Sequence, residues 1–447
     1  MNGGWRPTRA FGRAAAVGLA LLVIGTGLRR GDVAVLGVPL LGVALWSVLT
    51  APRTAPTARS RLEGGPVHEG ESLTWRVDVE PVAGLREVLA HLPADRWTET
   101  TPAHGHVVGT ARGDGTAVPV AVGVRPARWG VRRMGPAQVA AVGDLGSFVW
   151  SWPEQHTETL VVVPRPGDFT SRAALPHPVG LVGQHRSTRP GGGTELADIR
   201  PFRTGDRLRR IHWPVSLRTG ALHVTTTYAD EDAEVQVVVD AVRDLGHRDV
   251  ARGRLTSLDV AVEAAGAVAA HYLSTGDRVG LSVLGGGGLV EVPAVGGHHQ
   301  LARVLVGLGR AEPARGTLAE ERLLQAQLAR AVSPGAVVVL LSGLVSVGPL
   351  GQAVRLARSG HVVLVVDTLP AALAGTGVSA EDAMAATGIG DPRLARLVWR
   401  LRLLDREREV RRCAAAGVPV VPWQGAGSLD AVLRGLGRRR RSTAVGR

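Results

Sequence analysis

The sequence predicts an α/β protein with a doubly wound parallel sheet, preceded by a β-sandwich and by an N-terminal hairpin of transmembrane helices. Three observations carry this prediction. Two apolar runs, separated by a very short loop, open the chain. Short alternating segments broken by Gly, Pro and Asp follow until about residue 166. From residue 234 onward, continuous apolar segments alternate with helical patterns, as in a parallel sheet covered on both faces.

The two apolar runs are Ala14–Leu28 and Val33–Thr50, and only Arg29–Asp32 lies between them. The second run approaches the ~20 residues that span a bilayer, and flanking arginines can extend the first by reaching toward the headgroups. A signal peptide is the alternative for the first run. It lacks a small-x-small cleavage site, however, and the second run follows at once. We therefore expect a membrane hairpin.

The arginines around the hairpin predict its orientation. Three precede it and three follow it, whereas the connecting loop holds two beside Asp32. Basic residues are retained on the cytoplasmic side, so both ends and the bulk of the chain are expected in the cytoplasm. The flanking residues are Arg6, Arg9, Arg13, Arg53, Arg59 and Arg61.

Length and composition bound the remaining possibilities. At 447 residues, with 45% hydrophobic but only 4% aromatic residues, the chain should form two or three domains with aliphatic cores. All 52 basic residues are arginine, and the formal net charge is +13. Coding bias accounts for this excess; attraction to anionic lipid, nucleic acid or an acidic partner is the alternative. The arginines are not interleaved with aromatics in one stripe, which argues against a nucleic-acid groove. The single Cys413 excludes a disulfide framework.

Composition shifts divide the chain into successive segments. The segment 167–201 is rich in Gly, Pro, His and Arg and is expected to be loop, with 183–195 mobile. The predicted division is an N-terminus at 1–13, the hairpin at 14–50, a linker at 51–60, the β-sandwich at 61–166, a loop and motif segment at 167–233, the α/β domain at 234–433 and an Arg-rich tail at 434–447.

The α/β domain is predicted to alternate strands and helices. Expected strands are 235–240, 278–285, 289–295 as a hairpin partner, 336–343, 361–367 and 418–423. Expected helices are 258–273, 299–308, 318–332, a segment ending at 359 and 391–416. Binding in such sheets occurs at the carboxyl ends of the strands, where Asp240, Ser342 and Asp367 fall.

One stretch, 195–222, concentrates arginines around a turn and a tryptophan. Its notable positions are Arg200, Phe202, Gly205, Asp206, Arg209, Arg210, Ile211, Trp213 and Arg218. A second stretch, 128–151, holds Gly130, Gly135 and Pro136, followed by Asp144, Gly146 and Phe148. Both stretches resemble the bacterial family called domain of unknown function 58, and the resemblance covers most of the chain, hairpin included. The family usually has Tyr where this chain has Phe202, so any role of that hydroxyl is lost.

The resemblance implies a fold and a role. Family members often carry a von Willebrand factor type A-like domain and occur alongside MoxR-type AAA+ ATPases. It therefore implies a membrane-anchored adaptor acting with such an ATPase in assembly or maturation of other proteins. The rival expectations are a cell-envelope enzyme of unknown reaction and an Arg-driven nucleic-acid or anionic-lipid binding protein. We expect that this protein is not an enzyme, because the sequence shows no nucleophile–base pair.

The candidate binding residues are Arg200, Asp206, Arg209, Arg210, Trp213 and Arg218. They supply one acid, several guanidinium groups and an aromatic surface for stacking. One interpretation is a buried ion-pair cluster that clamps the β-sandwich to the α/β domain. The other is recognition of a carboxylate or phosphate on a partner.

The candidate metal residues are Asp240, Asp244 and Thr317, which would form a degenerate site for Mg²⁺. A von Willebrand type A domain binds Mg²⁺ through Asp-x-Ser-x-Ser, a later Thr and a later Asp. Here Val242 replaces the first Ser and has no side-chain oxygen, and Ser342 stands where the later Asp belongs. Mg²⁺ requires near-octahedral oxygen ligation, so we expect weak binding at most and no cofactor. The alternative is that Asp240 caps the segment that follows it.

Overall fold

The computed structural model describes residues 4–113, 115–152, 157–166, 190–204, 206, 208–228, 234–249, 253–286, 288–314, 326–328, 330–333, 335–345, 347–375 and 377–425. The chain divides into two compact units, residues 1–164 and residues 165–447. The first unit contains the apolar hairpin and the β-rich segment, and the second contains the motif segment and the α/β segment.

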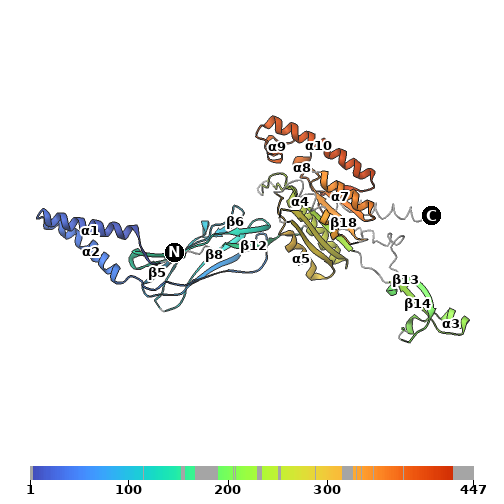
Figure 1. Cartoon of the computed structure of the whole chain (residues 1–447), viewed down its shortest axis with the longest axis horizontal. Coiled ribbons are helices and arrows are strands. Elements are labelled where there is room, and N and C mark those ends of the chain that lie inside the picture. Colours follow the sequence, from blue (N-terminus) through green and yellow to red (C-terminus); the bar gives the residue numbers. More distant parts are fainter. Residues whose placement is uncertain are drawn as a thin grey trace. The chain divides into compact units, whose positions relative to one another are not determined.

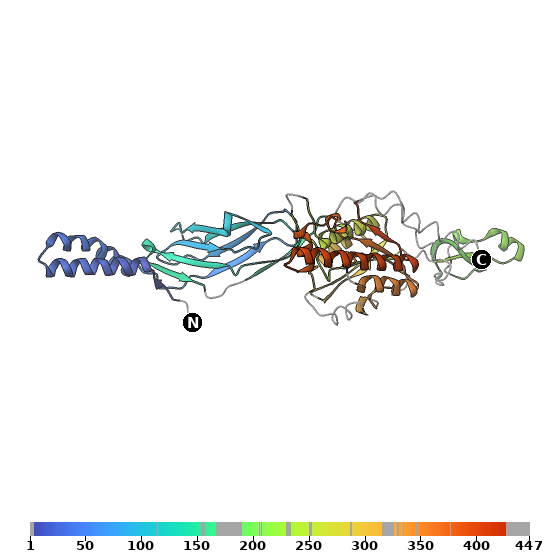
Figure 2. The same ribbon diagram turned by 90° about the horizontal axis from the view of Figure 1, so that it is seen from above.

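Two antiparallel helices, α1 (Arg9–Gly27) and α2 (Gly31–Leu49), form the hairpin and lie side by side in Figures 1 and 2. The Thr8 hydroxyl caps α1 by accepting from the Phe11 amide at 3.2 Å. By length and composition, both helices are able to cross a membrane. Large apolar side chains cover their outer surface, as expected for helices surrounded by lipid. Those at least 48% exposed are Val17, Leu19, Val23, Ile24, Leu28, Val35, Leu36, Val38, Val43, Leu45, Trp46, Val48 and Leu49.

Small residues form the contact between α1 and α2. Gly18 and Gly25 are buried on α1, where Gly18 lies against Gly37 and Gly25 lies against Ala34 of α2. A Cβ added at Gly37 would lie 2.6 Å from the Gly18 carbonyl oxygen, and one at Gly25 would lie 2.5 Å from the Ala34 nitrogen. Apolar side chains gain no hydrophobic free energy by leaving lipid for a contact between helices. Membrane helices therefore associate through small residues, which let their backbones approach closely. This interface therefore fits a bilayer setting.

The base of the hairpin is joined to the β-rich part of the first unit. Strand β1 (Arg6–Pro7) pairs antiparallel with β11 (Phe148–Ser151). The buried hydroxyl of Ser147 donates to that of Ser47 at 2.7 Å. The Trp5 indole N–H donates to the Thr54 carbonyl at 2.9 Å. The residues before the hairpin are thus partly a strand of the sheet.

Three sheets make up the β-rich part among the described residues, with orders β1-β11-β10-β5-β7, β2-β4-β8-β6 and β3-β12-β9. Their strands are β2 (Ala58–Glu63), β3 (Val67–His68), β4 (Leu73–Val79), β5 (Leu85–His91), β6 (Thr98–Thr101), β7 (His106–Thr110), β8 (Val118–Pro126), β9 (Gly130–Met134), β10 (Gln138–Gly143) and β12 (Glu158–Val163). Alternate residues of β4 and β8 are buried, because one face of each strand covers a shared core around Trp75. Strand β2 begins at Ala58, inside the range expected to be linker.

The second resembling stretch, 128–151, forms β9, β10 and β11 of this part. Arg132 on β9 is only 9% exposed and donates to the Asp95 carboxylate at 3.2 Å and to the Trp129 carbonyl at 2.6 Å. Arg86 pairs with Asp144, in the turn between β10 and β11. In this stretch the charged residues hold neighbouring segments of the first unit together.

A six-stranded sheet dominates the second unit, with order β17-β16-β15-β18-β19-β20 among the described residues. Its strands are β15 (Glu234–Asp240), β16 (Arg278–Gly285), β17 (Gly288–Val295), β18 (Val337–Ser342), β19 (Val362–Asp367) and β20 (Val420–Pro422). Only β17, the hairpin partner of β16, runs antiparallel. The sheet is therefore mixed rather than wholly parallel. Consecutive residues of β15 and β18 are buried, so both faces of the sheet are covered.

Helices flank this sheet. They are α4 (Ser257–Ser274), α5 (His298–Leu308), α7 (Val347–Arg358), α8 (Ala371–Ala374), α9 (Ala380–Thr387) and α10 (Pro392–Ala415). α4 packs against β15, β16 and α5, while α7 packs against β18, β19 and α10. Side chains of β15, β18 and β19 share one core with α7 and with Cys413 of α10. In Figure 1, α10 is the long orange-red helix beside α7.

The prediction of loop over 167–201 is wrong for 190–201, which forms strand β13 (Pro190–Pro201) paired with β14 (His223–Tyr228). The sequence pattern did not indicate this strand, because the strand begins with proline and glycine and both residues are rare inside strands. The predicted turn residue Gly205 and the positions 183–189 lie outside the described residues. So does most of the helix expected at 318–332.

Candidate functional site

The motif segment is a β-hairpin whose long connection carries a short helix. Strands β13 and β14 pair with Arg200 opposite Val224. The connection contains a 3₁₀ turn at Leu208–Arg210 and helix α3 (Trp213–Thr219). It returns to the hairpin through the Phe202 amide, which donates to the Leu222 carbonyl at 2.9 Å. The connection is therefore tied back to the strands.

Local sequence explains helix α3. The His212 Nδ1 accepts from the Val215 amide at 3.3 Å, and Pro214 occupies the first turn, where its missing N–H costs nothing. The Ser216 hydroxyl is buried and accepts from the His223 amide at 2.9 Å, which fixes α3 against β14. Gly220 ends the helix at φ 70°, a conformation that glycine adopts without strain.

Arg200 and Asp206 form a bidentate ion pair at the base of the connection. The guanidinium Nη2 lies 2.7 Å from Oδ1 and Nη1 lies 2.9 Å from Oδ2. The Asp206 Oδ2 also accepts from the Arg203 amide at 2.8 Å. The hydrogen bond from Arg200 holds the pKa of Asp206 below its ordinary value, and the same bond raises the pKa of Arg200. The pair closes the turn and remains partly open to solvent.

Replacing Arg200 with alanine is expected to raise the pKa of Asp206 toward the ordinary aspartate value. The folded-state pKa is now depressed, so the pair contributes to stability above the unfolded pKa, and this contribution disappears as pH falls through the folded pKa. NMR titration of the Asp206 carboxyl in the wild type and in Arg200→Ala measures both values. Arg209→Ala is the matched control and should leave the Asp206 titration unchanged. Equal pKa values in wild type and Arg200→Ala would contradict the assignment.

The other candidate residues do not converge on this pair. Arg209 and Arg218 are exposed, and Arg210 is half-buried. Trp213, at the start of α3, is 58% exposed. The structure thus brings together Arg200 and Asp206 and leaves Arg209, Arg218 and Trp213 on the surface of the segment. Their role in binding stays a prediction.

Exposed leucines accompany Trp213, and the sequence prediction did not include them. Leu217, one helical turn after Trp213, is 80% exposed. Leu208 is 69% exposed and Leu222 is 45% exposed. The four-residue spacing of Trp213 and Leu217 on a short helix was the signal available in the sequence. The segment therefore combines an apolar surface with neighbouring guanidinium groups.

The second candidate site lies at the carboxyl ends of the parallel strands. Asp240 ends β15 and Ser342 ends the neighbouring strand β18, where the order of strands reverses. The Ser342 hydroxyl donates to Asp240 Oδ2 at 2.6 Å, and the Val242 amide donates to Oδ1 at 3.1 Å. Asp240 thus caps the segment after its strand.

The neighbouring acids are engaged in the same way. Asp244 Oδ1 accepts from the Leu258 amide at 3.1 Å, at the start of α4. Asp367, at the end of β19, accepts from the Leu369 amide and pairs with Arg406 of α10. All three carboxylates therefore orient loops at this edge of the sheet.

Two features of these residues are unfavourable for a Mg²⁺ site. Both oxygens of Asp240 already accept hydrogen bonds, and the Val242 side chain is buried and has no oxygen. Within the described ranges, no group of three or more His, Cys, Asp or Glu side chains is arranged to hold a metal ion. Thr317 lies outside those ranges. Weak Mg²⁺ binding stays a prediction that direct titration decides.

Comparison with known proteins connects the motif segment to a family. Residues 198–387 match the sequence model of the family described as "Protein of unknown function DUF58". The uncharacterized proteins Mb1516 of Mycobacterium bovis and Rv1480 of Mycobacterium tuberculosis are each 35% identical to this chain over 121 residues, which is 27% of the chain. The aligned part spans 37% of the length of each relative.

A search of solved structures matches the reeler domain of human F-spondin, with 14% identity and a TM-score of 0.15, over 26% of this chain and 97% of that one. That likeness is too slight to carry an argument. The sequence match, by contrast, begins inside β13 and runs through the motif segment and the larger part of the six-stranded sheet. The resemblance to the domain of unknown function 58 family is thereby confirmed over residues 198–387.

Proposed function

We propose that this chain is a membrane-anchored binding protein that presents its second unit to a protein partner in the cytoplasm. The partner we propose is a MoxR-type AAA+ ATPase, acting with the chain in assembly or maturation of other proteins, as the family resemblance implies. The hairpin is the proposed anchor. Its two apolar helices, small-residue interface and flanking arginines support this role.

We propose further that the six-stranded sheet is von Willebrand type A-like. Counted along the chain from β15, the strand order is 3-2-1-4-5-6, with the third strand antiparallel at the edge. Ligands of such sheets bind beyond the carboxyl ends of the strands, where the order reverses. Here Asp240 and Ser342 bond to each other at that point. Metal-independent protein binding by this unit accords with that arrangement.

The exposed surface of the motif segment is the single observation that carries the proposal. Trp213 and Leu217 lie on successive turns of α3 and are 58% and 80% exposed. Isolated surface leucines are ordinary, but an exposed tryptophan beside arginines has the composition of an interface hot spot, and Leu217 adds apolar area next to it. The Arg200–Asp206 pair holds the connection in one conformation, which reduces the entropy lost on binding.

A role in binding rather than catalysis agrees with the state of the acids. Asp240, Asp244 and Asp367 each accept a backbone N–H, and the last also pairs with Arg406. Carboxylates that orient loops in this way are positioned for structure rather than for proton transfer. Covalent catalysis would also need a nucleophile beside a base, a pair that the sequence does not predict.

The double variant Trp213→Ala/Leu217→Ala tests the proposal. The full-length protein, purified in nanodiscs, is mixed with the MoxR-type ATPases of the same cell, and binding is measured by surface plasmon resonance. Loss of an aromatic anchor at the centre of an interface costs about 2 kcal/mol or more, so we expect binding about 30-fold weaker.

Val108→Ala is the matched control. Val108 is 58% exposed on β7 in the first unit, so its truncation removes apolar surface far from the motif segment in sequence. It should leave ATPase binding unchanged. Equal binding by wild type and the double variant would refute the motif segment as the docking site, and no binding by the wild type would refute the ATPase as the partner.

A further inference from the structure

Helix α10 has two apolar faces, and only one of them is packed. Ala395, Trp399 and Cys413 are each at most 1% exposed and bury the inner face in the second unit. A helix of a soluble unit normally presents polar residues on the side opposite its buried face. From Leu394 to Leu404 that opposite side of α10 is apolar instead.

Four leucines form a stripe on the outer face, which we name the leucine stripe: Leu394, Leu397, Leu401 and Leu404. They are 49%, 56%, 54% and 54% exposed. At 100° per residue they fall within about 80° of one another, roughly opposite Ala395 and Trp399. Their spacing of three, four and three residues is that of the a and d positions of two heptads. A second helix can pack against a row of leucines with this spacing.

The charged residues between the leucines of the stripe all have one sign, and the acidic Asp405 follows only after Leu404. Arg393, Arg396, Arg400 and Arg402 lie between Pro392 and Leu404, and this part of the helix has no acidic residue. The first three are exposed. A second copy of the same face would place arginine beside arginine, which repels. An acidic partner would instead be attracted.

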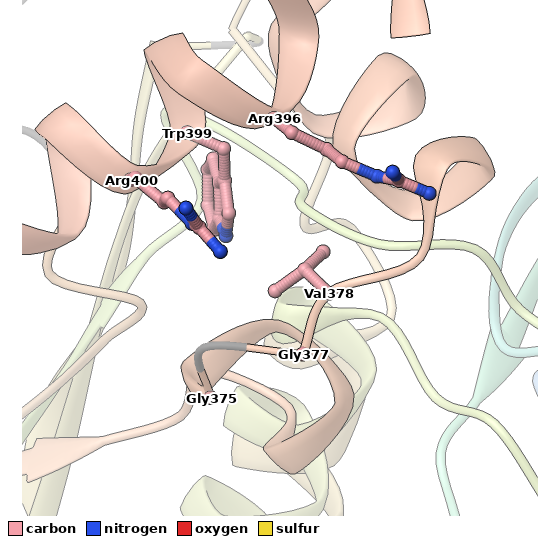
Figure 3. Close-up of a pocket in the computed structure, with 6 residues that line it drawn as sticks. All are labelled: Gly375, Gly377, Val378, Arg396, Trp399 and Arg400. Carbon is pink, nitrogen blue, oxygen red and sulfur yellow. The ribbon is translucent and has the colours of Figure 1, made fainter. Parts of the chain in front are cut away.

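A pocket lies on the arginine-rich side of the stripe, with a volume of about 290 Å³. Figure 3 shows Arg396, Trp399 and Arg400 on the α10 side and Val378, Gly377 and Gly375 across from them. Arg396 and Arg400 are four residues apart and therefore lie one turn apart along the helix. In Figure 3 the two side chains point in different directions, so each guanidinium group can pair with a separate carboxylate of a helix that lies on the stripe.

We propose that the outer face of α10 is a docking surface for an acidic amphipathic helix of a partner protein. The leucines of the partner helix would pack against the leucine stripe. Its Asp or Glu side chains would pair with Arg396 and Arg400 at the pocket. A bilayer surface fits less well, because an interfacial helix buries a broad apolar face, whereas this stripe is a narrow seam with arginines at its edge. This surface is separate from the motif segment, so the proposal stands independently of the function proposed above.

The test uses the full-length protein in phosphatidylcholine nanodiscs and a fluorescent synthetic helix of about three heptads, with Leu at positions a and d and Glu at e and g. Fluorescence anisotropy should report binding that weakens about tenfold or more in Leu397→Ser/Leu401→Ser. Arg396→Gln/Arg400→Gln should also weaken binding and reduce its dependence on salt. All replaced side chains are exposed, so circular dichroism should show an unchanged fold.

Two controls define the result. Val108→Ser, in the first unit, should bind the acidic helix as the wild type does, and a helix with Lys at e and g should not bind. Equal affinity of the wild type and Leu397→Ser/Leu401→Ser for the acidic helix would overturn the proposal. Hydrogen exchange of residues 392–404 is also compared, without the peptide, between phosphatidylcholine and phosphatidylglycerol nanodiscs. Protection found only in phosphatidylglycerol would overturn the proposal and indicate that the stripe binds a bilayer surface. Self-association lost in the leucine variant would overturn it in favour of a second copy.

Discussion

Replacing Trp399 with alanine is expected to lower the free energy of unfolding by about 3–5 kcal/mol. The side chain is 1% exposed and packs with Leu245, Leu369 and Leu373. Its indole N–H donates to the Leu373 carbonyl at 3.0 Å, in a buried setting. Alanine leaves a cavity and removes that donor, so the loss combines lost burial with an unmet carbonyl. Chemical denaturation of the full-length protein in detergent, followed by circular dichroism, measures it.

The matched control for Trp399 lies two residues away on the same helix. Leu401 is 54% exposed, so Leu401→Ala should change stability by no more than about 0.5 kcal/mol. Trp399→Phe keeps an aromatic ring and loses the N–H, so it should fall between the wild type and Trp399→Ala. A Trp399→Ala loss as small as that of Leu401→Ala would show that the inner face of α10 is not packed as described.

The second large effect is expected at Asp259, a 3%-exposed carboxylate in the first turn of α4. Its Oδ1 accepts from Arg248 at 3.0 Å, and the Arg248 side chain is itself only 11% exposed. Its Oδ2 accepts from the Thr256 amide at 3.2 Å, and the Thr256 hydroxyl accepts from the Asp259 amide at 3.1 Å, which completes a capping box. Asp259→Ala removes the carboxylate from a buried guanidinium and one half of the cap. We expect a loss of about 3–5 kcal/mol.

Asp259→Asn separates the two contributions. The amide oxygen can still accept from the Thr256 N–H, whereas the negative charge facing Arg248 is gone. Its stability should therefore lie between that of the wild type and that of Asp259→Ala in the same denaturation experiment. Arg408→Ala is an exposed control for the loss of a charge, since its side chain is 70% exposed and pairs with a similarly exposed Asp405. If Asp259→Ala unfolded no more easily than Arg408→Ala, the buried pair would not contribute as argued.

Local patterns predicted the regular elements of the α/β segment closely. The strand expected at 278–285 forms β16 over Arg278–Gly285, and the helix expected at 258–273 forms α4 over Ser257–Ser274. These elements have strong apolar periods and clear ends, and Thr256 with Asp259 supplies a capping box at the start of α4. The hairpin partner of β16 was also predicted and is confirmed as β17. The binding role expected for the motif residues stays a prediction.

Elements that depend on distant partners were not predicted. Strand β13 begins with Pro190 and three glycines and forms because β14 pairs with it. Strand β1 is two residues long and exists through its pairing with β11, more than 140 residues away in the sequence. The short helices α8 and α9 pack under α10, around Leu373 and Ala383. Pairing and packing of this kind leave no periodic signal in the segment itself.

The sequence by itself determined the apolar helix pair, the β-rich segment, the alternation of strands and helices after residue 234, and the resemblance of residues 198–387 to the domain of unknown function 58 family, because each depends on a local pattern or motif. Tertiary structure alone decided which of the predicted site residues meet. Arg200 reaches Asp206 because the turn folds back toward β13, and Asp240 meets Ser342 because β15 and β18 are neighbours in the sheet. It also decided that α10 keeps its leucine stripe exposed, since hydrophobic periodicity marks an apolar face but does not state whether the chain covers it.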